Sequence, residues 1–160
     1  QPDVFRYVRE GRRIIVLRTF SKTFGLAGMR LGYAVASAEG VELMQRVRQP
    51  FNVSAMALAA GEAALDDVKF IEKTRKMVAS GLAFFEKRLA ALKIPFVPSC
   101  ANFILVKVGN GRKVFQAMQR EKVIVRPMDG YGLPEHIRIS VGLPSENVRC
   151  INALAKVLGR

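Results

Sequence analysis

The sequence predicts an α/β protein, and three features of its patterning lead to that prediction. Two short apolar runs, residues 14–18 and 31–36, flank a polar, glycine-containing segment, as expected for buried strands joined by a loop. A long amphipathic stretch, residues 67–93, comes later in the chain. Beyond it, short apolar runs alternate with helical patterns up to residue 160.

Two helices are expected between the second strand and the long amphipathic stretch. Residues 38–48 form the first, which ends before Pro50 because the residue that precedes a proline avoids the helical region. Ser54 is placed to cap a second, alanine-rich helix over residues 55–66, since serine is a preferred N-cap residue.

Residues 67–93 are expected to form one long helix with a core-facing stripe. Apolar residues recur there at spacings of seven, four, three, four and three, which places them on one helical face. These residues are Ile71, Val78, Leu82, Phe85, Leu89 and Leu92, and Phe70, Met77 and Phe84 widen the stripe.

The remainder predicts a small ββαββα-like arrangement. The expected strands are Phe96–Val97, Phe103–Val106, Val123–Val125 and 136–141. A turn at Gly109–Gly111 leads into a helix over about 112–121. In the last strand, Ile137, Ile139 and Val141 share one face, with Arg138 and Ser140 on the other. Pro144 suits the first turn of a closing helix whose expected apolar face is Val148, Ile151, Ala155 and Leu158.

The net charge of +13 is spread along the chain, as +5 over residues 1–50, +2 over 51–100 and +6 over 101–160. No dense basic run or zinc-finger spacing occurs, so small anionic ligands are favoured over nucleic acid. No apolar run approaches the length of a membrane span. The two cysteines, Cys100 and Cys150, are far apart in the sequence, which favours free thiols in a reducing cytoplasm. With a single histidine as well, the sequence predicts no metal site.

The segment between the first two strands carries the clearest chemical signal. Lys22 lies at a strand-to-loop junction, where a lysine can be desolvated and aimed for Schiff-base chemistry with a carbonyl cofactor. Thr19, Ser21 and Arg30 lie close by in the sequence. Two hydroxyls and a guanidinium are the groups that a phosphate dianion needs.

The same segment resembles the cofactor-lysine motif of the pyridoxal 5′-phosphate aminotransferases of fold type I. It is most similar to the histidinol-phosphate aminotransferase branch, from Thr-Phe-Ser-Lys at 19–22 through Gly-Leu-Ala-Gly at 25–28 to Arg-Leu-Gly-Tyr at 30–33. Thr23 departs from the motif, which usually has a smaller residue there. Later landmarks follow in the expected order, namely Pro50–Val53, Ala101–Phe103, Val125–Pro127 and His136–Gly142.

The resemblance implies a fold in two parts. Residues 1–66 would be the C-terminal remnant of the large cofactor-binding domain, with its two strands neighbouring and antiparallel. Residues 67–160 would be the linking helix and a small α+β C-terminal domain. The family's chains are more than twice this length, so we expect a piece of a longer protein. The part not present would supply a phosphate loop, a ring that stacks on the cofactor and an aspartate for the pyridine nitrogen, so we expect weak cofactor binding or none.

The resemblance also implies roles for individual residues. Pyridoxal phosphate would link to Lys22, which then moves the substrate Cα proton, and Thr19, Ser21 and Arg30 would bind its phosphate. Arg138 would clamp the substrate α-carboxylate, and Arg126 would meet a substrate phosphate. Asn52 and Asn102 either line the site or are simple turn and cap residues, and Tyr131 either covers the substrate or is merely exposed.

Three functions remain open at this stage. The first is a transaminase, homodimeric like its family, that moves an amino group from a donor such as glutamate to a phosphorylated keto acceptor in histidine biosynthesis. The second is a non-catalytic folded fragment without cofactor that self-associates through its orphan strands. The third is another reaction on the same fold, such as decarboxylation, against which the carboxylate-binding Arg138 argues.

Overall fold

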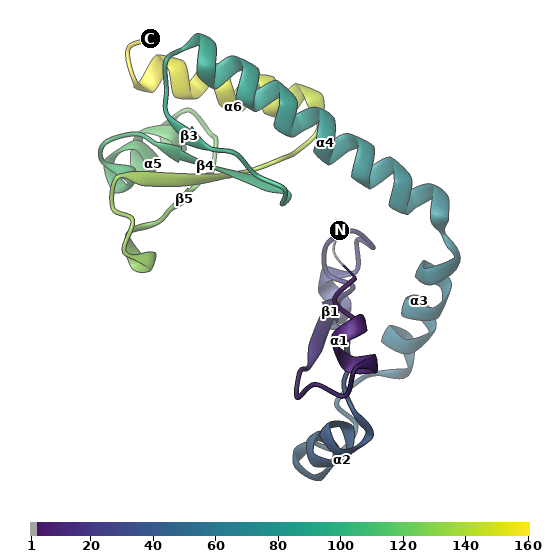
Figure 1. Ribbon diagram of the computed structural model, residues 1–160. Coiled ribbons are helices and arrows are strands. Elements are labelled where there is room, and N and C mark those ends of the chain that lie inside the picture. The colour runs from purple at the N-terminus through teal and green to yellow at the C-terminus, as the bar shows by residue number, and fades with distance from the viewer. Residues whose placement is uncertain (1–2) are drawn as a thin grey trace. The chain divides into compact units, whose positions relative to one another are not determined.

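The computed structural model describes residues 3–160, which divide into two compact units. The first unit extends to Lys73 and the second runs from Thr74 to Arg160. One helix, α4 (Val68–Ala91), begins in the first unit and ends in the second (Figure 1). None of the helices among the described residues combines the length and apolar character required to cross a bilayer.

The first unit is built on a two-stranded antiparallel ribbon. Strands β1 and β2 pair from Val16 opposite Val35 to Thr19 opposite Gly32, which confirms the predicted antiparallel neighbours. Its elements before α4 are α1 (Arg6–Arg9), β1 (Val16–Thr19), the 3₁₀ turn η1 (Ala27–Met29), β2 (Gly32–Val35), α2 (Ala38–Val47) and α3 (Ala55–Asp66).

Side-chain caps fix where α2 and α3 begin. Ser37 Oγ accepts a hydrogen bond from the Gly40 N–H at 3.2 Å, and Ser54 Oγ accepts one from the Ala57 N–H at 3.2 Å. Each cap satisfies one of the backbone donors that a helix start leaves free, worth about 1 kcal/mol. The predicted cap at Ser54 is therefore confirmed.

The second unit contains a four-stranded antiparallel sheet in the order β3-β4-β6-β5. Chain order is β3-β4-α5-β5-β6-α6, so the predicted ββαββα arrangement is confirmed. Its elements after α4 are β3 (Phe96–Val97), β4 (Phe103–Lys107), α5 (Gly111–Arg120), β5 (Arg126–Pro127), the 3₁₀ turn η2 (Asp129–Tyr131), β6 (His136–Ser140) and α6 (Pro144–Val157).

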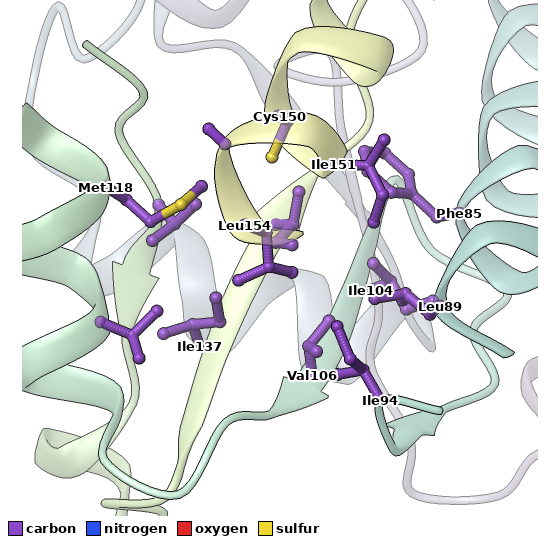
Figure 2. Close-up of a cluster of buried hydrophobic side chains, with 14 of the residues drawn as sticks. Phe85, Leu89, Ile94, Ile104, Val106, Met118, Ile137, Cys150, Ile151 and Leu154 are labelled. Carbon is purple, nitrogen blue, oxygen red and sulfur yellow. The ribbon is translucent and has the colours of Figure 1, made fainter. Parts of the chain in front are cut away.

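The core of the second unit lies between one face of this sheet and its helices. Figure 2 shows inward side chains of the sheet, such as Ile104 and Ile137, meeting Phe85 of α4, Met118 of α5 and Leu154 of α6. All five side chains are fully buried, with 0% of their surface exposed. Burying a side chain of this size fully contributes about 1.5–3 kcal/mol. The core therefore fixes which face of β6 is free for chemistry.

Two sequence-based expectations about the second unit are wrong. Residues 123–125 form no strand; Ile124 is 83% exposed, and the pairing with β6 starts only at Arg126. The preceding turn, in which Lys122 has a left-handed φ of 57°, leads this apolar run into the sheet edge with Val125 buried in the core and Val123 partly buried against it.

The second error concerns the rotation of α6. Val148 was expected on the apolar face but is 44% exposed, whereas Asn147, Cys150, Ile151 and Leu154 are buried. The side chain of Asn147 hydrogen-bonds the backbone that precedes the helix. This polar contact turns the helix relative to the face that apolar periodicity alone predicts.

Candidate active site

Residues 20–31 form a closed loop, here called the lysine loop, between β1 and β2. Its ends are joined by the Phe20 N–H, which donates to the Leu31 carbonyl at 3.1 Å. Within it, the Leu26 N–H donates to the Phe20 carbonyl at 3.0 Å, and the Gly25 N–H donates to the Lys22 carbonyl at 2.9 Å. Lys22 therefore begins a tight turn whose backbone is fixed by hydrogen bonds on both sides.

The lysine loop presents its amine and holds one hydroxyl close to its own backbone. Lys22 is exposed, and Ser21 is half-buried. The Ser21 N–H donates to Thr19 Oγ1 at 3.1 Å, so the Thr19 hydroxyl lies against the backbone immediately before Lys22. The structure thus brings the two predicted hydroxyls to the strand end from which the lysine projects.

Arg30 closes the 3₁₀ turn η1 in a strained conformation. Its φ of 54° lies in the left-handed region, which costs energy for a residue with a Cβ. Its Nη1 donates to the Ala27 carbonyl at 2.8 Å, and the residue is exposed. Because the residue is exposed, its guanidinium stays solvated and keeps further N–H groups free for an anion.

The charge around the lysine loop is uniformly positive. Residues 11–38 contain no aspartate or glutamate, whereas Arg18, Lys22 and Arg30 all lie in this stretch. Among residues 3–160, none of the ion pairs involves these three side chains. An amine, two hydroxyls and an unpaired guanidinium form a donor set that fits a phosphorylated carbonyl compound such as pyridoxal phosphate.

In the second unit, Arg126 and Arg138 occupy directly opposed positions on β5 and β6. Arg138 lies on the face of β6 opposite the buried Ile137 and Ile139, with its guanidinium 5.0 Å from the centre of the Phe103 ring. Its Nε is buried and has no hydrogen-bond partner. Like charges opposite each other destabilise a sheet. An anion bound next to the two guanidinium groups would relieve this repulsion.

Arg126 is held by an aromatic neighbour rather than by an acid. Its Nη2 donates to the Tyr131 hydroxyl at 2.8 Å, and its guanidinium lies 5.1 Å from that ring's centre. The nearest acid in sequence, Asp129, is taken by Arg112, whose hydrogen bond holds the pKa of that carboxyl below its usual range. Neither opposed arginine has an acidic partner among the described residues.

The other predicted site residues stand apart from these contacts. Asn52 is exposed and follows Phe51, a fully exposed residue with a left-handed φ of 55°. Asn102 is exposed as well, and its carbonyl accepts the Val141 N–H at 2.9 Å. No side-chain hydrogen bond within residues 3–160 joins either asparagine to the lysine loop or to the opposed arginines.

Sequence reasoning missed Asn147, a buried polar residue next to the strand that carries Arg138. Asn147 Oδ1 accepts the Gly142 N–H at 2.9 Å, and its Nδ2 donates to the Gly142 carbonyl at 3.1 Å. A Cβ at Gly81 of α4 would lie 2.3 Å from Val141 Cγ1 and 3.1 Å from Asn147 Nδ2. The signal that could have revealed this contact is an asparagine at a helical spacing shared with apolar residues, since Asn147 lies on the same face of α6 as Cys150, Ile151 and Leu154.

The family "Aminotransferase class I and II" matches residues 3–154. The histidinol-phosphate aminotransferase of Akkermansia muciniphila is 48% identical over 98% of this chain, and histidinol-phosphate aminotransferase 2 of Ralstonia nicotianae is 45% identical over 100% of it. The chain covers 43% and 44% of these two relatives, so it spans less than half of their length.

A solved structure gives the same picture. The crystal structure of histidinol-phosphate aminotransferase from Sinorhizobium meliloti, in complex with pyridoxal-5′-phosphate, matches 91% of this chain and 41% of its own. The TM-score is 0.74 at 28% identity. The family match extends over nearly all of the described residues, including the lysine loop and both opposed arginines. The chain belongs to the class I and II aminotransferase family.

Proposed function

We propose that the activity to which this chain contributes is transamination with pyridoxal phosphate, between an amino acid and a phosphorylated keto acceptor of the histidinol-phosphate type. The observation that carries the proposal is the lysine loop. There an exposed lysine begins a hydrogen-bonded turn among hydroxyls and a guanidinium, with no acid between Gly11 and Ala38. This combination suits a ligand that offers both an aldehyde and a phosphate.

Thr19 at the end of β1 and three residues of the lysine loop would each have a separate role. Lys22 would hold the aldehyde carbon of the cofactor, and Thr19, Ser21 and Arg30 would donate hydrogen bonds to its phosphate. When bound, pyridoxal phosphate supplies an electron sink for the substrate Cα. The Nζ of Lys22, free of the cofactor once substrate has replaced it, would accept the Cα proton and return it.

The opposed arginines would select and orient the substrate. A guanidinium fork binds a carboxylate through two parallel hydrogen bonds, and Arg138 has a buried Nε without a partner. Arg126, directly opposite on β5, would bind a second anionic group, which the names of the similar proteins suggest is a phosphate. A homodimer in a reducing cytoplasm is part of this proposal, and the free thiols of Cys100 and Cys150 are consistent with that compartment.

The test is a titration of the folded chain with pyridoxal phosphate, followed by borohydride reduction and mapping of the modified lysine. Binding should be weak in a chain that spans less than half of its relatives, but we expect the label to fall on Lys22 in preference to the other lysines, and this preference to be lost in Arg30→Gln. A folded chain in which Lys22 is labelled no more than an exposed lysine such as Lys113 would contradict the proposal. A donor and acceptor screen on the full-length protein would then test the substrates, with glutamate expected among the best donors and a phosphorylated keto compound among the best acceptors.

A second candidate is a self-associating fragment without catalysis. Exposed apolar side chains on the first unit favour it, since Leu17 of β1 is 71% exposed, Val47 is 82% exposed and Phe51 is fully exposed. Sedimentation velocity with and without pyridoxal phosphate separates the two candidates. Self-association that is unaffected by the cofactor, together with no label on Lys22, would favour the second.

A further inference from the structure

Two helices contact the lysine loop at two different places. At its base, a Cβ on Gly61 of α3 would lie 2.3 Å from Leu31 Cδ2 and 3.8 Å from Phe20 Cε1. At its turn, a Cβ on Gly25 would lie 3.1 Å from Phe70 Cζ and 3.3 Å from Phe70 Cε1. The first contact is buried, since Phe20 and Leu31 are 5% and 9% exposed. The second contact touches the residue that closes the Lys22 turn.

Gly25 is the position through which the turn is held. Its N–H donates to the Lys22 carbonyl at 2.9 Å, and its φ of +71° lies in the region that glycine adopts without strain. Any side chain at this position would both strain the backbone and meet the Phe70 ring. The ring therefore lies directly against the backbone of the turn, with no side chain of the loop between them.

Phe70 is itself fixed in place by the start of α4. Asp67 Oδ1 accepts the Phe70 N–H at 2.9 Å, and the Asp67 carbonyl accepts the Ile71 N–H at 3.2 Å. The Phe70 residue is 43% exposed, so its ring does not serve mainly to fill the core. The ring contacts the backbone at Gly25 while remaining partly exposed, so this contact is not part of a buried core.

We propose that Phe70 is a positioning residue for Lys22, which it serves by bracing the Gly25 end of the lysine turn. This inference rests on the proposed function, because Lys22 is there the residue that bonds the cofactor. Since α4 continues to Ala91 and contributes Leu82, Phe85 and Leu89 to the core of the second unit, the brace belongs to the longest helix of the chain. A turn that loses its brace samples more conformations and presents its amine less often in the reactive geometry.

Two measurements on the same 160-residue chain test the proposal. In Phe70→Ala, amide exchange at Gly25 should speed up by about tenfold while exchange at Val41 in α2 stays unchanged. In the same variant, the preference of pyridoxal phosphate for Lys22 over Lys113, trapped with borohydride, should fall by about fivefold to tenfold. Phe70→Leu, which keeps an apolar side chain against Gly25, should restore most of the preference. Val68→Ala, in the same helical turn, is the control and should change neither measurement.

The outcomes separate this inference from the proposed function. If wild type labels Lys22 preferentially and Phe70→Ala keeps that preference, Phe70 does not position the amine. Unchanged Gly25 exchange in Phe70→Ala also overturns the proposal, whether or not Lys22 is labelled. If wild type shows no preference for Lys22, it is the proposed function that fails. If Phe70→Ala does not fold, the same two measurements on Phe70→Leu and Phe70→Val decide, with the larger loss expected for valine.

Discussion

Arg126 on β5 and Arg138 on β6 stand directly opposite each other, yet each guanidinium contacts an aromatic ring and neither is paired with an acid within residues 3–160. Such an arrangement is unfavourable by itself, because like charges across a strand pair repel. It becomes favourable when anionic groups bind between or beside the two side chains. In the proposed function, the pair would bind a substrate that carries more than one negative group.

Replacing Arg138 with lysine should weaken anion binding even though the charge is kept. Lysine cannot offer the two parallel donors of a guanidinium fork, so affinity for a dicarboxylate such as glutamate should fall by about tenfold or more. Chemical-shift titration of the chain measures this. Arg149→Lys on the exposed side of α6 serves as the matched control and should bind as wild type does. Equal affinities for Arg138→Lys and wild type would remove this arginine from the site.

Asn147→Ala should strongly destabilise the second unit, although the substitution removes only a few atoms. The substitution leaves the half-buried Gly142 N–H and carbonyl without their partners, and an unsatisfied polar group that is shielded from water costs about 1–3 kcal/mol. We expect the free energy of unfolding to fall by about 2–4 kcal/mol in urea titrations. Asn152→Ala, an exposed asparagine on the same helix, should change it by less than about 0.5 kcal/mol. Equal effects of the two substitutions would show that the Gly142 contacts contribute little.

Because of Cys150, the free energy of unfolding should decrease as the pH rises into the alkaline range. Burial raises the pKa of this thiol from 9.0 to about 11, so the unfolded chain loses the proton first. Stability from this group is fully present below pH 9 and is lost as the pH rises through about 11. The loss should be about 2–3 kcal/mol.

The measurement is the difference in unfolding free energy between wild type and Cys150→Ala at several pH values from 8 to about 11, because this difference isolates the contribution of the thiol. Cys100→Ala, at the exposed cysteine, should show no such difference in slope. A constant difference between wild type and Cys150→Ala across this range would mean that the buried thiol does not ionise on unfolding.

Gly61→Ala should destabilise the first unit despite alanine's better helix propensity. The new methyl group would stand 2.3 Å from Leu31 Cδ2, and overpacking of this kind costs about 1–3 kcal/mol. The propensity gain of about 1 kcal/mol offsets only part of that cost. Gly40→Ala in α2, where the nearest atom would be 3.3 Å away, should be neutral or stabilising. Thermal unfolding followed by circular dichroism compares the two, and a stabilised Gly61→Ala variant would show that Leu31 moves aside freely.

The sequence predicted most helices and strands because their signals are local. Ser54 caps α3 through its own neighbour three residues on, and the stripe of Leu82, Phe85 and Leu89 follows from helical periodicity. The prediction failed where a distant partner decides. Residues 123–125 have strand-like side chains, but the backbone pairs with β6 only from Arg126. Val148 fits the apolar period of α6, but Asn147 takes the buried position through its bonds to Gly142.

The candidate site divides in the same way. By itself the sequence determined the identity and order of the chemical groups, with Lys22, its hydroxyl neighbours and the two arginines recognisable from residue types and spacing. Only the tertiary structure decided that Arg126 faces Arg138, that Asn147 anchors the end of β6 and that Phe70 lies against the Lys22 turn. The reason is physical: covalent spacing fixes which groups are available, whereas contacts between residues dozens of positions apart depend on how strands pair and helices pack.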